Sequence, residues 1–92
     1  MISSADFIRN NVDNIKSECT DILNKISEDL PKTGLLIDST WEVTYVPYGL
    51  TEHVAKIVAK ELKQSGWICE FSMNSARTEI SFSIYPNTNH IL

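Results

Sequence analysis

The chain of 92 residues contains only two cysteines, three glycines and three prolines. The few cysteines and glycines exclude several classes of protein and of binding site. Cys19 and Cys69 are too few for a disulfide scaffold, and neither has a second ligand at zinc-binding spacing. No stretch approaches the roughly 20 apolar residues that a membrane-spanning helix needs. The first residues lack the basic and apolar segments of a signal peptide, so we expect a reducing, cytoplasmic environment.

Catalytic and phosphate-binding motifs are also missing. Gly49 stands alone before a predicted helix, without the several glycines that let consecutive backbone N–H groups surround a phosphate. His53 and His90 have no HExxH, HxxxH or CxxC partners, so neither is a predicted metal ligand. No nucleophile, base and orienting residue occur in a recognisable arrangement. We therefore expect a protein that is not an enzyme and that uses no metal or cofactor.

The composition is that of a small, folded, mildly acidic domain. The hydrophobic fraction of 42% and the charged fraction of 22% are ordinary for one globular unit of this size. Twelve Asp and Glu against eight Lys and Arg give a net charge of −4, which disfavours nucleic acid and membrane surfaces as partners. The frequent Ile, Asn, Ser and Lys are also typical of AT-rich genomes, such as those of many bacteriophages.

A long amphipathic helix is predicted for about residues 4–29. Its capping residues are Ser3 and Asp6, and Pro31 followed by Gly34 predicts an end near Asp29. Apolar residues recur at steps of three and four and make one stripe, which contains Ile8, Val12, Ile15, Cys19, Ile22 and Ile26.

The predicted helix is longer than the sheet that it covers. It spans roughly 39 Å, against about 23 Å for a strand of seven residues. Unless the helix bends, part of its apolar stripe extends beyond the sheet. Three covers are open: the connector at residues 35–37, the tail at residues 91–92, or a second copy in a homodimer.

The remaining sequence, about residues 41–85, predicts a β-α-β-β unit followed by a tail at residues 86–92. Alternating apolar and polar residues predict strands over residues 41–45, 67–73 and 77–85. Between the first two lies a helix over residues 52–65, with Thr51 as its N-cap and Gly66 as the left-handed residue after it. With the last strand in the middle, both helices cover one face of a split β-α-β sheet. The expected fold is a single two-layer α+β domain in the order α-β-α-β-β.

The surface of this domain suggests three modes of action. The first is a small inhibitor or adaptor, such as a bacteriophage accessory protein, that binds a host protein through the exposed side of the first helix and the polar sheet face. The residues predicted to bind that partner are Asp13, Glu18, Asp21, Glu28, Glu42 and Thr44. The alternative is a structural or assembly module that self-associates through its N-terminal helix. The third is a weak binder of anions or nucleic acid through a basic stripe formed by His53, Lys56, Lys60, Lys63 and Arg77.

Overall fold

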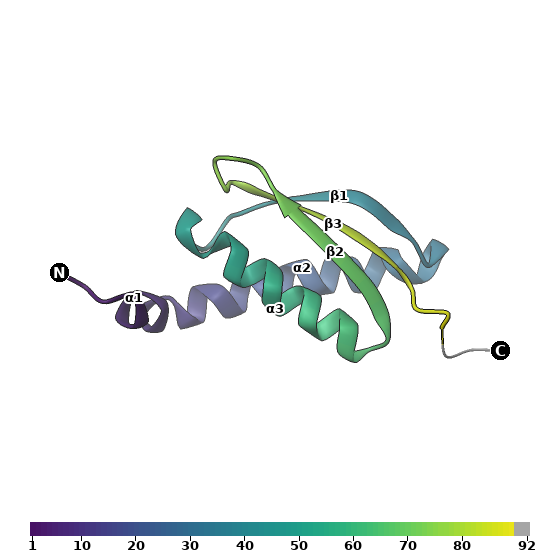
Figure 1. The fold of residues 1–92 in the computed structure, drawn as a ribbon, viewed down its shortest axis with the longest axis horizontal. Helices are drawn as coiled ribbons and strands as arrows, with labels where there is room; N and C mark the ends of the chain where they lie inside the picture. The colour runs from purple at the N-terminus through teal and green to yellow at the C-terminus, as the bar shows by residue number, and fades with distance from the viewer. Residues whose placement is uncertain (90–92) are drawn as a thin grey trace.

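Three antiparallel strands form one sheet, and two helices cover one of its faces (Figure 1). The computed structural model describes residues 1–89, so His90 and the predicted cover at residues 91–92 lie outside the described residues. The elements in chain order are α1 (Ser4–Asn10), α2 (Val12–Thr33), β1 (Leu36–Glu42), the short 3-10 helix η1 (Tyr48–Leu50), α3 (Thr51–Gln64), β2 (Trp67–Met73) and β3 (Glu79–Pro86). The predicted α+β class is confirmed, and the sheet order β1-β3-β2 places β3 in the middle, as in a split β-α-β sheet.

The core lies between the sheet and the pair α2 and α3. Every second residue of β3 points into it: Ile80, Phe82 and Ile84 are 0%, 2% and 0% exposed. This alternation follows from the two-residue period of a strand that has a buried and an open face. The helices supply the facing side chains, which include Ile15, Ile22, Ile26, Leu30, Val54, Ala55, Val58 and Leu62.

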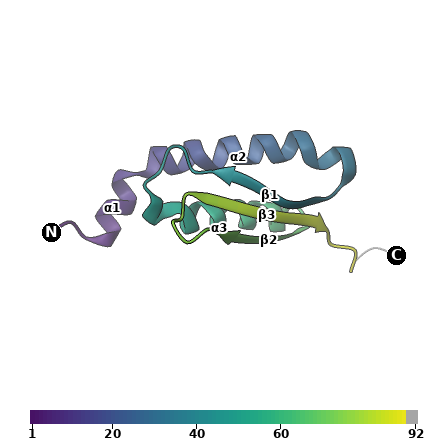
Figure 2. The same cartoon turned by 90° about the horizontal axis from the view of Figure 1, so that it is seen from above.

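The predicted first helix is two helices, because the chain bends at Asn11. The Asn11 side-chain amide donates to the Phe7 carbonyl (2.9 Å), which is the acceptor that its own backbone N–H would use in a continuous helix. That N–H donates to the Ile8 carbonyl instead (3.0 Å). Figure 2 shows α1 turned away from the axis of α2. The predicted overhang is therefore relieved in part by a bend.

The predicted end of this helix at Asp29 is also wrong, because α2 continues to Thr33. Pro31 lies in the last turn, where its missing N–H removes a single hydrogen bond. Leu30 is buried, which holds this turn against the core. The helix ends at Gly34, whose φ of +71° is left-handed and whose N–H donates to the Leu30 carbonyl at 2.7 Å.

The first strand begins earlier than predicted, and it includes residues that we expected to be a connector. Its pairing with β3 is irregular between Leu36 and Ser39, and Asp38 has a φ of +49° there. The bulge breaks the alternation of apolar and polar side chains, so the sequence pattern does not indicate a strand at these residues. The strand ends at Glu42; the Val43 N–H still donates to the Thr78 carbonyl, and the amides of Thr44 and Tyr45 then donate to a carboxylate on α2.

The start of α3 differs from the prediction as well. Thr51 is not the N-cap, since η1 leads directly into the helix and Thr51 is its first residue. The Thr51 side chain is fully buried, and its hydroxyl donates to the Arg77 carbonyl at 2.6 Å. It thus ties the beginning of α3 to the loop between β2 and β3. Gly66 follows the helix with a φ of +90°, as expected for the residue after a C-cap.

Candidate functional site

One of the predicted partner-binding residues, Glu18, is a structural residue of the interior. The expectation that it lies on the exposed side of the helix is wrong, because its side chain is 0% exposed. Its carboxylate accepts hydrogen bonds from the backbone N–H groups of Thr44 (2.6 Å) and Tyr45 (3.2 Å). These amides follow the end of β1 and have no strand partner in the described residues, so the carboxylate supplies their acceptor. In turn, the two N–H groups satisfy a carboxylate that is itself buried.

Asp21, one turn further along α2, reaches the same segment from the surface. The Asp21 carboxylate raises the pKa of the Tyr45 phenol above its ordinary value, through hydrogen bonding and through its charge. Glu18 and Asp21 of α2 therefore act on consecutive residues, Thr44 and Tyr45, just after the end of β1 at Glu42. Asp13 and Glu28 are exposed elsewhere on α2, and Glu28 lies 3.8 Å from Lys25.

The strands carry charge of only one sign. They contain four acidic residues and no Lys or Arg, whereas the rest of the chain has eight of each sign. The whole net charge of −4 therefore resides on the sheet. We call this region the acidic sheet surface; it comprises Asp38, Glu42, Glu70 and Glu79 with the hydroxyl residues Thr40, Ser72, Ser81 and Ser83.

The acidic sheet surface has no basic counterpart within residues 1–89. The ion pairs in that part of the chain join helical residues to one another or to Arg77, and none includes an acidic residue of a strand. Glu70 accepts a hydrogen bond from the Tyr85 hydroxyl (3.1 Å), which raises the pKa of Tyr85. Glu42 and Glu79 stand directly opposite each other in the register of β1 and β3. Like charges at such positions destabilise a sheet.

The predicted basic stripe is partly occupied by an acid of the protein itself. Arg77 and Lys56 both contact the Glu52 carboxylate, at 3.3 and 3.4 Å. The hydrogen bond from Arg77, followed by that from Lys56, lowers the pKa of Glu52 below its ordinary value. Glu52 also lies in the first turn of α3, where a negative charge is favoured by the helix dipole. An external anion would meet this carboxylate first, while Lys60 and Lys63 remain exposed further along the helix.

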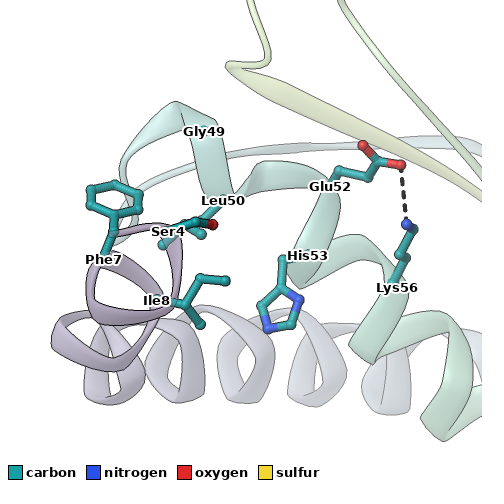
Figure 3. Close-up of a pocket in the computed structure, with 8 residues that line it drawn as sticks. All are labelled: Ser4, Phe7, Ile8, Gly49, Leu50, Glu52, His53 and Lys56. Carbon is teal, nitrogen blue, oxygen red and sulfur yellow. Dashed lines mark ion pairs between the residues drawn. The ribbon is translucent and has the colours of Figure 1, made fainter. Parts of the chain in front are cut away.

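A hollow of about 260 Å³ lies at the corner where η1 leads into α3. Figure 3 shows Ile8 of α1 and His53 of α3 pointing toward each other across it, with the ion pair of Glu52 and Lys56 at its rim. The other lining residues are Ser4, Phe7, Gly49 and Leu50. The Gly49 side of the corner is open, since nothing lies within 4 Å of where a Cβ would be. The hollow is the junction of three helical segments, and its groups form no nucleophile, base and orienter.

A second hollow, of about 190 Å³, lies between α2 and α3. Only helical residues line it, so it faces away from the sheet, and we call it the helix groove. Its lining residues are Ile15, Lys16, Cys19, Thr20, Leu23, Ile57 and Glu61. The groove is largely apolar, with Lys16 on one helix and Glu61 on the other.

Both thiols are buried, since Cys19 and Cys69 are each 6% exposed. Burial, and to a smaller extent the charge of Glu18, raises the pKa of Cys19 from 9.0 to about 11, and burial also raises the pKa of Cys69. Near pH 8 we expect Cys19 to alkylate at least about 100-fold more slowly in the native protein than in urea, because a rise of about two pKa units leaves that much less thiolate. Because folding raises the pKa of Cys19, the folded state holds the proton more tightly than the unfolded state does. The free energy of unfolding therefore falls as the pH rises from 9.0 toward 11. Iodoacetamide labelling followed by mass spectrometry measures the alkylation rate of Cys19 in each condition. Equal rates in the native protein and in urea would show that the thiol is accessible in the folded state.

The described part of the chain offers few other chemical features. No three His, Cys, Asp or Glu side chains within residues 1–89 are grouped to hold a metal ion. No helix in the same range is long and apolar enough to cross a membrane. Comparison with protein-family models, curated proteins and solved structures finds no match to the chain.

Proposed function

We propose that this protein is a non-enzymatic inhibitor or adaptor that docks on a basic surface of another protein through the acidic sheet surface. The observation that carries the proposal is the concentration of the whole net charge of −4 on the strands. The helices α2 and α3 pack against the opposite face, so the acidic side is open to a partner (Figure 1). A bacteriophage accessory protein acting on a host protein fits this mode of action.

The chemistry of the acidic sheet surface favours a protein over other partners. Its carboxylates repel the phosphates of nucleic acids and of anionic membranes. Small-molecule sites are usually deep and apolar, whereas this face combines carboxylates with the hydroxyls of Ser and Thr. Hydroxyls and carboxylates together can accept hydrogen bonds from Lys and Arg side chains of a protein partner.

A basic partner would also remove a repulsion that exists in the free protein. Glu42 and Glu79 face each other across β1 and β3 without a cation beside them in the described residues. A Lys or Arg side chain placed between them converts this repulsion into two attractive contacts. Such charges act on the rate of association and on specificity, so binding is expected to weaken as salt is added.

Two charge reversals of equal size test the proposal. Glu42→Lys changes the sheet and Glu61→Lys changes the helix groove, and both alter the net charge by the same amount. A partner recovered in stoichiometric amounts from host lysate is then titrated against each purified variant. We expect Glu42→Lys to weaken binding by about 10-fold or more at low salt and Glu61→Lys by less than about 2-fold. The reverse order would place the docking surface on the helices.

Self-association is a second candidate function, favoured by the helix groove. Leu23 and Ile57 are half-buried in it, and nothing in residues 1–89 lies over them. Because Lys16 and Glu61 lie on different helices, a two-fold axis can place each beside its opposite charge on a second copy. Ile57→Glu is expected to abolish such a dimer. Sedimentation that shows a strict monomer at high micromolar concentration would rule it out.

A further inference from the structure

We infer that the outer edge of β1 accepts a short, basic, extended segment of the partner as a fourth strand of the sheet. The inference rests on the proposed function, since it specifies how an acidic docking surface would engage a basic protein. It adds the mode of recognition, which is strand addition at a sheet edge. Three features carry it: the outward-pointing backbone groups of β1, the bounded length of this edge and the charges along it.

Some backbone N–H and C=O groups of β1 point away from the sheet. In the order β1-β3-β2 this strand is at the edge, and its outer side pairs with no strand within residues 1–89. The Val43 N–H donates inward to the Thr78 carbonyl at 2.9 Å. Backbone groups alternate in direction along an antiparallel ladder, so those of Glu42 and Thr40 point outward. The Glu42 carbonyl accepts a hydrogen bond from the Thr44 hydroxyl (3.3 Å) and keeps a second lone pair for a further donor. Both residues are exposed. Figure 2 shows α2 alongside β1, and Figure 1 shows that α2 belongs to the helix layer below the sheet, so an added strand would lie over α2.

The available edge is short and has two defined ends. At one end, Asp38 has a φ of +49° and the register with β3 is irregular, which interrupts the ladder. At the other end, Glu18 binds the N–H groups of Thr44 and Tyr45 and turns the chain toward α2. Only residues 39–43 lie between these ends. An edge of this length suits a specific short segment and resists uncontrolled stacking of strands.

The charges along the edge select the chemistry of the added segment. Asp38 lies at one end of it and Glu42 near the other, and both are exposed. Beside Glu42, a hollow of about 230 Å³ is lined by Glu79, Tyr48, Val43 and Thr78. Two carboxylates and an exposed tyrosine ring are suited to a Lys or Arg side chain. A strand that carries basic residues at alternate positions would place them on this face of the sheet.

The same charges disfavour a second copy of the chain as the occupant. Two β1 edges paired antiparallel about Thr40 place Asp38 of one copy against Glu42 of the other. Pairing about Glu42 places the two Glu42 side chains opposite each other, and pairing about Trp41 makes them diagonal neighbours. Each register brings like charges together, which destabilises the pair. A basic segment meets the same positions with opposite charge.

The test uses a synthetic peptide of about nine residues in which Lys alternates with Val and Thr. Three matched probes accompany it on the full-length protein: Glu in place of Lys, N-methylation at alternate residues, and the basic peptide with the Glu42→Lys variant. We expect the basic peptide to protect the outward amides of Thr40 and Glu42 from hydrogen exchange, observed residue by residue by NMR. The acidic and N-methylated peptides should give no protection, and Glu42→Lys should weaken binding about 10-fold.

The outcomes separate this inference from the proposed function. Equal binding of the basic and N-methylated peptides, without amide protection, overturns strand addition but leaves docking by charge in place. No effect of the basic peptide on β1 also overturns strand addition, and the comparison of Glu42→Lys with Glu61→Lys then decides the proposed function separately. The amides of Thr40 and Glu42 could instead be protected without peptide, with protection that rises with the protein concentration. That result would identify a second copy of the chain as the occupant of the edge and would overturn the basic segment as its occupant.

Discussion

Replacement of Glu18 by alanine is expected to lower the free energy of unfolding by about 3 kcal/mol. The mutation leaves the N–H groups of Thr44 and Tyr45 without the carboxylate that accepts their hydrogen bonds at 2.6 and 3.2 Å. It also leaves a void, because the Glu18 side chain is fully buried. A domain of this length has a total stability of roughly 5–14 kcal/mol, so the loss is a large share of it. Urea unfolding followed by circular dichroism gives the value.

Two further variants identify the origin of this loss. Glu28→Ala removes an exposed carboxylate from the same helix and is expected to cost less than about 0.5 kcal/mol. Glu18→Gln keeps the shape and one acceptor oxygen, so its effect should lie between those of the two alanine variants. Hydrogen exchange at Thr44 and Tyr45 should accelerate in Glu18→Ala. If Glu18→Ala and Glu28→Ala have the same effect, the carboxylate does not hold the segment after β1.

The burial of Glu18 could be predicted from the period of the helix, although its acidic character argued against it. Glu18 lies three residues after Ile15 and four before Ile22, which places it within the apolar stripe. An acid on a buried face needs donors, and the donors come from residues 44 and 45, which are distant in sequence. Which amides lack a strand partner depends on where β1 ends. The helical pattern therefore shows that Glu18 is buried, but tertiary structure decides what it binds.

The sequence pattern predicted the central strand β3 better than the edge strand β1. β3 has a clear alternation because it is central and has one buried and one open face. β1 is an edge strand with a bulge at Asp38, so its side chains do not alternate and its start was missed. The bend at Asn11 was missed for another reason. The apolar steps continue through it, and one side-chain hydrogen bond to Phe7 makes the break.

The acidic sheet surface was accessible from the sequence only in part. The predicted strands already contained no Lys, and Glu42 and Thr44 were among the predicted binding residues. The pairing of Glu42 with Glu79 could not be predicted, because it depends on the register between β1 and β3. For the basic stripe, the sequence pattern predicted more free positive charge than the structure has. A helical period places Lys56 on that stripe, but Glu52 takes both Lys56 and Arg77 as its partners.

Replacement of Phe82 by alanine is expected to have the largest effect on stability, a loss of about 4 kcal/mol. Phe82 is 2% exposed in the central strand, and its ring lies 6.4 Å from that of Phe71 on β2. Truncation removes a large buried apolar surface and this aromatic contact, and it leaves a cavity beneath the sheet. Because β3 pairs with both other strands, the loss weakens the support of the β1 edge as well. Urea unfolding of the purified variant measures the loss.

Two control variants separate packing from strand pairing. Phe82→Leu retains most of the buried volume and is expected to cost about 1.5 kcal/mol. Ser81→Ala changes the adjacent residue of the same strand, whose hydroxyl lies 3.3 Å from that of Thr40 on the open face. Its cost is expected to stay below about 1 kcal/mol because water can replace an exposed hydrogen bond. A loss at Ser81 equal to that at Phe82 would mean that the two faces of β3 are assigned the wrong way round. The acidic sheet surface would then be buried, and docking through it would be ruled out.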